Sequence, residues 1–233
     1  MINQFKVESY KFLRSIFLWL AMLFMVAVGI YNGFKWDVSA HATEIMTSFD
    51  QALPDMSFVF MPALFTAWFI GSNFSTRTIH HEITSGASRL SVILSRSLPA
   101  ISSGIVLHSA YIVSTVISLG GRIGFDTFIL SSDHVLWIVT VLLQMIALES
   151  FFVFIGFLCC NLYIGLISSV ISAFTLVNVF RNIFRDASWY QFSFFHFWEN
   201  NSSADLITCS AVAVVSIVVF SALSYIVFRK REI

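Results

Sequence analysis

Six runs of about twenty apolar residues are the feature of this sequence that most restricts its fold. A helix needs roughly 20 residues to cross the ~30 Å hydrocarbon core of a bilayer, and each run is long enough. Transmembrane β-strands are excluded because they are about ten residues long and alternate between apolar and polar positions. We therefore predict an all-α polytopic membrane protein that forms a single transmembrane domain over residues 1–233. The six predicted spans are approximately residues 16–34, 56–73, 98–119, 135–159, 162–180 and 206–228.

The composition agrees with burial in a bilayer. Hydrophobic residues make up 58% of the chain and charged residues 11%, whereas a soluble domain has about 25% charged residues. The net charge is zero, so no overall basic field favours nucleic acid as a partner. Cys159, Cys160 and Cys209 lie in or beside apolar runs, and we expect no disulfide framework.

Lysines and arginines are divided unevenly between the two sides of the predicted bundle. With the N-terminus in the cytoplasm, nine lie in cytoplasmic segments, and Lys35, Arg122, Arg181 and Arg185 lie outside. Positively charged residues favour cytoplasmic loops, so we expect both termini in the cytoplasm. The nine are Lys6, Lys11, Arg14, Arg77, Arg89, Arg96, Arg229, Lys230 and Arg231.

The segment before the first span mixes apolar and charged residues. Phe5, Tyr10 and Phe12 alternate with Lys6 and Glu8. This pattern is typical of an amphipathic elbow helix at the membrane surface, and equally of a frayed basic anchor.

Residues 74–96, FSTRTIHHEITSGASRLSVILSR, form the only substantial cytoplasmic loop of this topology. Ile79 and Ile83 are one turn apart among polar residues, which predicts a short amphipathic helix over residues 74–85. Gly86 can supply its left-handed stop, and Ser88 can cap a following helix that leads into the third span. Such a helix can transmit force from a soluble partner, or the loop can serve only to fix topology.

The same loop resembles the first cytoplasmic loop of type-2 ABC exporter permeases. The C-terminal stretch YIVFRKREI is similar to the ending of that family, and the length and six spans also agree. The residues that carry the resemblance, in the loop and just before it, are Gly71, Phe74, Arg77, Thr78, Gly86, Ser88, Arg89, Ile93, Leu94 and Arg96.

The resemblance implies a permease subunit in the plasma membrane of a bacterium, exporting an amphipathic or hydrophobic substrate such as a peptide, antibiotic or lipid-like molecule. It implies a separate ABC ATPase subunit that binds ATP and magnesium, and a second permease subunit, identical or related. The chain itself has no G-x-x-x-x-G-K-[ST] run, so we expect a transport subunit without a cofactor rather than an enzyme. The residues implied to form the ATPase-coupling loop are Arg77, Thr78, His80, His81, Glu82, Gly86, Ser88 and Arg89.

Glu149 is the only carboxylate deep in an apolar run, and His108 is a polar residue inside the third predicted span. An ionisable group at membrane depth costs a few kcal/mol unless it is paired, protonated or in contact with water. We therefore predict that Glu149 and His108 lie on a substrate path. Alternatively, Glu149 lies near an interface, and His108 forms a hydrogen bond between helices.

Residues 181–205 contain too many aromatic side chains for a solvated outer loop. We expect short helices lying at the outer membrane surface, either as a gate or as a simple aromatic belt. The predicted gate residues are Trp189, Tyr190, Phe194, Phe195 and Trp198. The spacing of the histidines predicts no metal site.

Other functions remain open on the sequence. A membrane immunity or sensor protein could bind a peptide without transporting it. A non-ABC carrier would be expected to show internal repeats, and none is evident. An intramembrane protease would need a catalytic constellation stronger than the adjacent His108 and Ser109.

Overall fold

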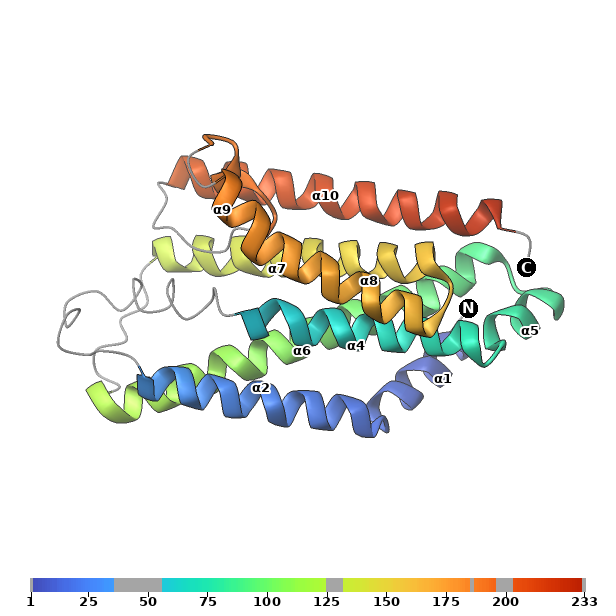
Figure 1. Ribbon diagram of the computed structural model, residues 1–233, viewed down its shortest axis with the longest axis horizontal. Coiled ribbons are helices and arrows are strands. Elements are labelled where there is room, and N and C mark those ends of the chain that lie inside the picture. Colours follow the sequence, from blue (N-terminus) through green and yellow to red (C-terminus); the bar gives the residue numbers. More distant parts are fainter. Residues whose placement is uncertain (1, 36–55, 125–131, 185–186, 196–202, 232–233) are drawn as a thin grey trace.

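The computed structural model describes residues 2–35, 56–124, 132–184, 187–195 and 203–231, and every regular element among them is helical. Six of these helical segments are long and apolar enough to cross a membrane, which confirms the predicted all-α polytopic class. The long helices run side by side in a bundle (Figure 1). In chain order the elements are α1 (Ile2–Leu13), α2 (Ile16–Lys35), α4 (Met56–Ser75), α5 (Thr78–Thr84), α6 (Arg89–Ile123), α7 (Ser132–Cys159), α8 (Leu162–Phe174), the π-helical η3 (Thr175–Phe180), α9 (Arg181–Phe184), the 3-10 turn η4 (Tyr190–Phe192) and α10 (Ser203–Lys230).

Two predicted spans differ from the helices that form. α6 is one helix of 35 residues that passes through Pro99, so it is about 52 Å long and exceeds the ~30 Å hydrocarbon core. The predicted fifth span is regular only in α8, because its remainder winds into the wider η3 before α9. As expected, α7 and α8 are joined by the tight turn Cys160–Asn161, where the Asn161 side chain caps α8.

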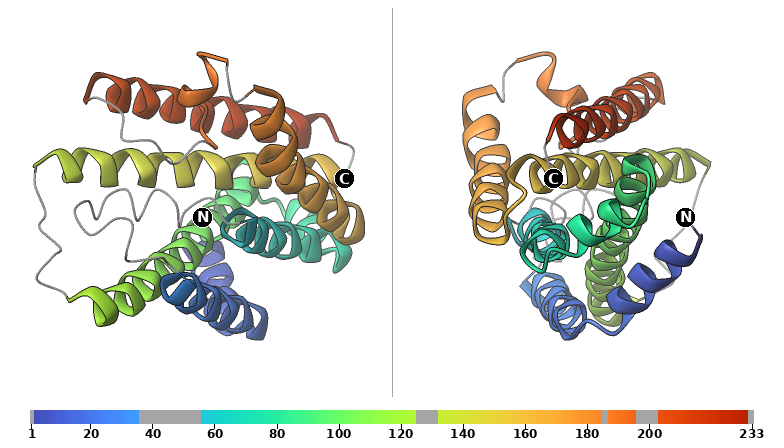
Figure 2. Two further views of the ribbon diagram at one scale, coloured as in Figure 1. Left: turned by 60° about the vertical axis from the view of Figure 1, so that its left-hand side comes forward. Right: turned by 90° about the vertical axis from the view of Figure 1, so that its right-hand side faces the viewer.

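The helices are buried to different extents. In the most apolar stretch of each, 61% of residues are buried in α4 and α7, but only 22% in the segment Leu162–Phe184, which begins with α8, and 17% in α10. α10 packs chiefly on α7, α2 on α6, and α8 on α4, so these three helices lie outside the central group (Figure 2). Their outward apolar side chains are the surface that a bilayer covers.

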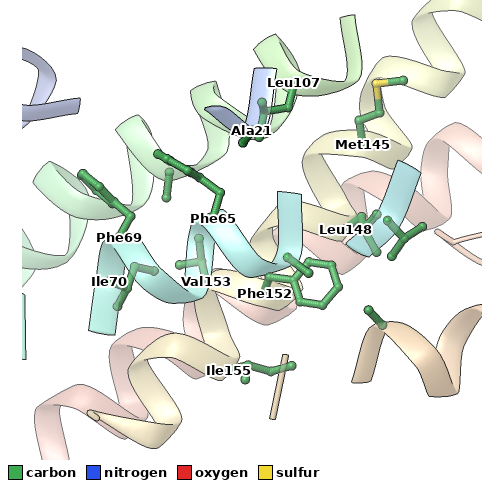
Figure 3. Packing of buried hydrophobic residues seen from close by; sticks show 14 of the residues in the cluster. Ala21, Phe65, Phe69, Ile70, Leu107, Met145, Leu148, Phe152, Val153 and Ile155 are labelled. Carbon is green, nitrogen blue, oxygen red and sulfur yellow. The ribbon is translucent and has the colours of Figure 1, made fainter. Parts of the chain in front are cut away.

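One apolar core joins the inner helices. Ala21 of α2, Phe65 of α4, Leu107 of α6 and Phe152 of α7 all belong to it (Figure 3). α2 contributes buried residues three or four positions apart along a single face, so it presents a narrow stripe to the bundle. That stripe consists of Leu18, Ala21, Met25, Gly29 and Gly33.

Glycines let α2 and α6 approach closely. A Cβ on Gly29 would overlap the Ser114 hydroxyl, and one on Gly33 would overlap the Ser118 hydroxyl. Small residues four apart are a recurrent device for close helix contact in membranes, where van der Waals packing drives association. At the end of this contact Arg122 donates hydrogen bonds to the carbonyl oxygens of Gly33 and Phe34, the last turn of α2.

α1, α5 and the C-terminal end of α10 lie at the same end of the bundle (Figure 1). Arg231, just after α10, donates a hydrogen bond to the carbonyl oxygen of Leu158 at the end of α7. The predicted orientation requires this arrangement, with both termini and the 74–96 loop on one side of the membrane.

Candidate functional site

The 74–96 loop folds as a short helix set between two long ones. α5 has seven residues, and it is separated from α4 by a turn in which Arg77 has a left-handed φ of 57°. The predicted helix over residues 74–85 is therefore too long at its start, because α4 continues to Ser75. The predicted stop is confirmed, since Gly86 has a φ of 93° and α5 ends before it.

α5 is amphipathic, as the two isoleucines predict. The Ile79 side chain is 1% exposed, and Ile83 is partly buried against the core. His80 and His81 are exposed on the outer side of the helix, and Arg77 is exposed at its start. The bundle therefore holds the apolar side of α5 and leaves a polar face directed outward.

The remaining loop residues act locally. Thr78 shares a hydrogen bond of 2.8 Å with Thr76 in the turn before α5. Ser88 caps α6 as predicted, because its hydroxyl accepts a hydrogen bond from the backbone N–H of Ser91.

Arg89 faces this chain rather than the outer side of α5. Its Nη1 donates hydrogen bonds to the carbonyl oxygens of Phe228, Arg229 and Arg231, at 3.0, 2.7 and 2.7 Å. These carbonyls lie at the end of α10, where they have no helical partner and where a cation is favoured by the helix dipole. Arg89 therefore joins the start of α6 to the C-terminus.

Arg96 anchors α5, a role that the sequence patterns did not predict. Arg96 is fully buried, and its Nη2 lies 2.5 Å from Glu82 Oε1 of α5 and 3.5 Å from Glu8 Oε1 of α1. The buried Val92 and Ala100 lie one turn before and after Arg96 on α6. That spacing is a usable signal, because a cation on the buried face of a helix requires carboxylates nearby.

Glu149 lies where three helices meet inside the bundle. It is fully buried on α7, and Oε2 accepts a 2.7 Å hydrogen bond from the Thr66 hydroxyl of α4. On the other side, the carboxyl group packs on Gly104 of α6, where a Cβ would lie 2.2 Å from its carbon. Oε1 has no hydrogen-bond partner, and none of the ion pairs of the described residues includes Glu149.

His108 shares this location with Glu149. Its Nδ1 lies 2.6 Å from the carbonyl oxygen of Gly104, so Nδ1 carries the donated proton. Its ring stands edge-on to Phe58 of α4, with 4.2 Å between ring centroids. Gly104 thus brings the two predicted path residues together, and both are enclosed by the chain's own helices.

The predicted gate residues are distributed around the segment that includes η4. Tyr190 is 3% exposed, whereas Trp189 is 50% exposed and contacts Phe184 of α9. Phe194 packs against Phe151 of α7 and Phe220 of α10.

Phe195, the next predicted gate residue, contacts Phe180 of η3 and also Tyr190. Trp198 lies outside the described residues.

Together these features define an all-α polytopic membrane protein. At one end the amphipathic helix α5 packs on the bundle with its polar face outward, and Glu149 is buried in the interior. Comparison with known proteins gives no matching family model and no matching curated protein. Within the described ranges no group of three or more His, Cys, Asp or Glu residues could hold a metal ion.

Proposed function

We propose that this chain is the permease subunit of an ATP-driven ABC exporter in the plasma membrane of a bacterium. Its substrate is amphipathic or hydrophobic, in the class of peptides, antibiotics and lipid-like molecules. The observation that carries the proposal is α5, a short helix between two spans with its apolar side buried and its polar side exposed. Such a helix suits contact with a soluble ATPase that moves during its cycle.

The contacts that hold α5 on the bundle favour a docking role for α5 over a role that only fixes topology. A loop with the latter role needs positive charge but no defined contact with the bundle. α5 instead has Ile79 buried in the core and Glu82 paired with the buried Arg96 of α6. A displacement of α5 by a partner is therefore transmitted to α6 and to the helices around it.

The ATPase partner binds ATP and magnesium, and a second permease subunit, identical or related, completes the pathway. In this arrangement the substrate path opens between α4, α6 and α7, beside Glu149 and His108. Both residues are polar groups that an opening between these helices would uncover.

Co-expression with an ABC ATPase, first the one encoded beside this gene if there is one, tests the proposal. The tagged chain should co-purify with the ATPase and give ATP hydrolysis that a hydrophobic or amphipathic peptide stimulates. Reversing charge on the exposed face, with Arg77→Glu and His81→Glu together, should lower the recovered ATPase about tenfold through loss of complementary charge.

Lys35→Glu is the control, because Lys35 is exposed at the C-terminal end of α2, the end away from α1 and α5. Its reversal changes the charge by two units, against three for the double variant with a neutral histidine. It should leave ATPase recovery unchanged. Recovery that is equal for all three proteins would mean that the α5 face does not dock the ATPase. Failure of any ABC ATPase to associate would remove the proposed function.

A further inference from the structure

The buried Arg96 lies close to carboxylates from two different helices. Arg96 on α6 lies 2.5 Å from Glu82 of α5 and 3.5 Å from Glu8 of α1, both through Nη2. Glu8 is also 2.8 Å from the Lys11 amino group one turn along α1. The cluster thus contains two acids and two bases, with Arg96 and Glu8 inside it and Lys11 half-exposed.

The cluster leaves several of its hydrogen-bonding atoms unused. Arg96 Nε, Glu8 Oε2 and Glu82 Oε2 are buried and have no hydrogen-bond partner in the structure. A guanidinium group binds a carboxylate best through two parallel N–H···O bonds, and that paired geometry is stronger and more specific than one bond. Arg96 can form it with either carboxylate, but the shared nitrogen forms it with neither.

We propose that Arg96 is a positioning residue that exchanges between Glu82 and Glu8. Pairing with Glu82 holds α5 in the position described here, and pairing with Glu8 releases α5 from α6. Arg96 keeps a carboxylate partner in both arrangements, so the buried cation is never left unpaired. Glu82, whose side chain is already 22% exposed, is the group that loses its partner when α5 is released. The exchange is a property of this chain alone, so it stands or falls independently of the proposed exporter function.

Lys11 sets the balance between the two arrangements. Its amino group already binds Glu8 Oε1, the same oxygen that lies nearest to Arg96. This contact neutralises Glu8 and weakens its attraction for Arg96, which favours pairing with Glu82. Lys11 thereby stabilises the position of α5 without touching α5.

Hydrogen–deuterium exchange of the α5 backbone amides tests whether Arg96 changes partner between Glu82 and Glu8. It is measured on the full chain in micelles, without a partner protein. Glu82→Gln should speed exchange in α5 about tenfold, because Arg96 then pairs with Glu8 and the charged contact to α5 is lost. Glu8→Gln should leave α5 exchange equal to or slower than that of the unmodified chain, since Arg96 then pairs only with Glu82. Neutralising one acid at a time avoids Arg96→Gln, which would leave Glu82 without its cation and Glu8 with only the half-exposed Lys11.

Lys11→Gln distinguishes a change of partner by Arg96 from a purely structural role of the cluster. If Glu8 competes for Arg96, removing Lys11 should speed α5 exchange about threefold although Lys11 lies on α1. A structural cluster predicts instead that both glutamate variants speed α5 exchange alike and that Lys11→Gln leaves it unchanged. That pattern, or unchanged exchange in Glu82→Gln, would overturn the proposal.

Discussion

Thr66 Oγ1 donates a 2.7 Å hydrogen bond to Glu149 Oε2 and so joins α4 to α7 in the interior of the bundle. Thr66→Val keeps the shape of the side chain and removes this donor from Oε2, while Oε1 already has no hydrogen-bond partner. We expect the free energy of unfolding in mixed micelles to fall by about 1–2 kcal/mol. Thr66→Ser, which keeps the hydroxyl, is the control and should lose less. A Thr66→Val effect of the same size in a Glu149→Leu background would show that the hydrogen bond is not the cause.

Gly104 provides the space that the Glu149 carboxyl group occupies. Gly104→Ala should destabilise the chain by about 1–3 kcal/mol, because the new Cβ would lie 2.2 Å from the carboxyl carbon. Glu149→Ala should relieve most of that loss in the double variant. Gly121→Ala is the matched control on the same helix, since nothing lies within 4 Å of its Cβ. Thermal unfolding that is equally affected by both alanine substitutions would contradict this packing.

Two arginines of one loop should behave differently. Arg89→Gln removes the hydrogen bonds to the last carbonyls of α10 and should cost about 1–3 kcal/mol of stability, with faster hydrogen exchange at the end of α10. Arg77→Gln should change stability by less than about 0.5 kcal/mol, because Arg77 is exposed. Equal losses in the two variants would mean that Arg89 does not cap α10.

The orientation in the membrane can be read by cysteine labelling. In a background without Cys159, Cys160 and Cys209, a membrane-impermeant maleimide added outside whole cells should label Ser203→Cys and not Ser85→Cys. The reason is that nine of the lysines and arginines lie on the Ser85 side. Labelling of Ser85→Cys alone would reverse the orientation and place α5 away from any cytoplasmic partner.

Local patterns in the sequence predicted the spans and the main features of α5 because neighbouring residues determine them. Apolar run length defines a span, Ile79 and Ile83 define a buried side, and Gly86 permits the left-handed stop. The pairing of Arg96 with Glu8 was not predictable in this way. These residues are far apart in the chain, and their contact depends on how α1 packs against α6.

The same limit explains Arg89 and Glu149. The family resemblance implied that Arg89 belongs to an ATPase-coupling loop, but the packing of α10 places the terminal carbonyls of this chain within reach of Arg89. The sequence marked Glu149 as unusual, yet its contacts with Thr66 and Gly104 come from two other helices. Contacts between side chains of different helices can be predicted only when the packing of those helices is known as well as their sequences.

Arg122 shows how insertion and folding can favour different residues at one position. Under the expected orientation it is a positive charge on the outer side, which opposes the charge bias that directs the chain into the membrane. It nevertheless completes the last turn of α2, whose carbonyls would otherwise lie at a membrane boundary without donors. Removing it would strengthen the signal for orientation and weaken the contact between α2 and α6. Charge counts in such a chain therefore understate how strongly its orientation is encoded, because some of the opposing charges are retained for stability.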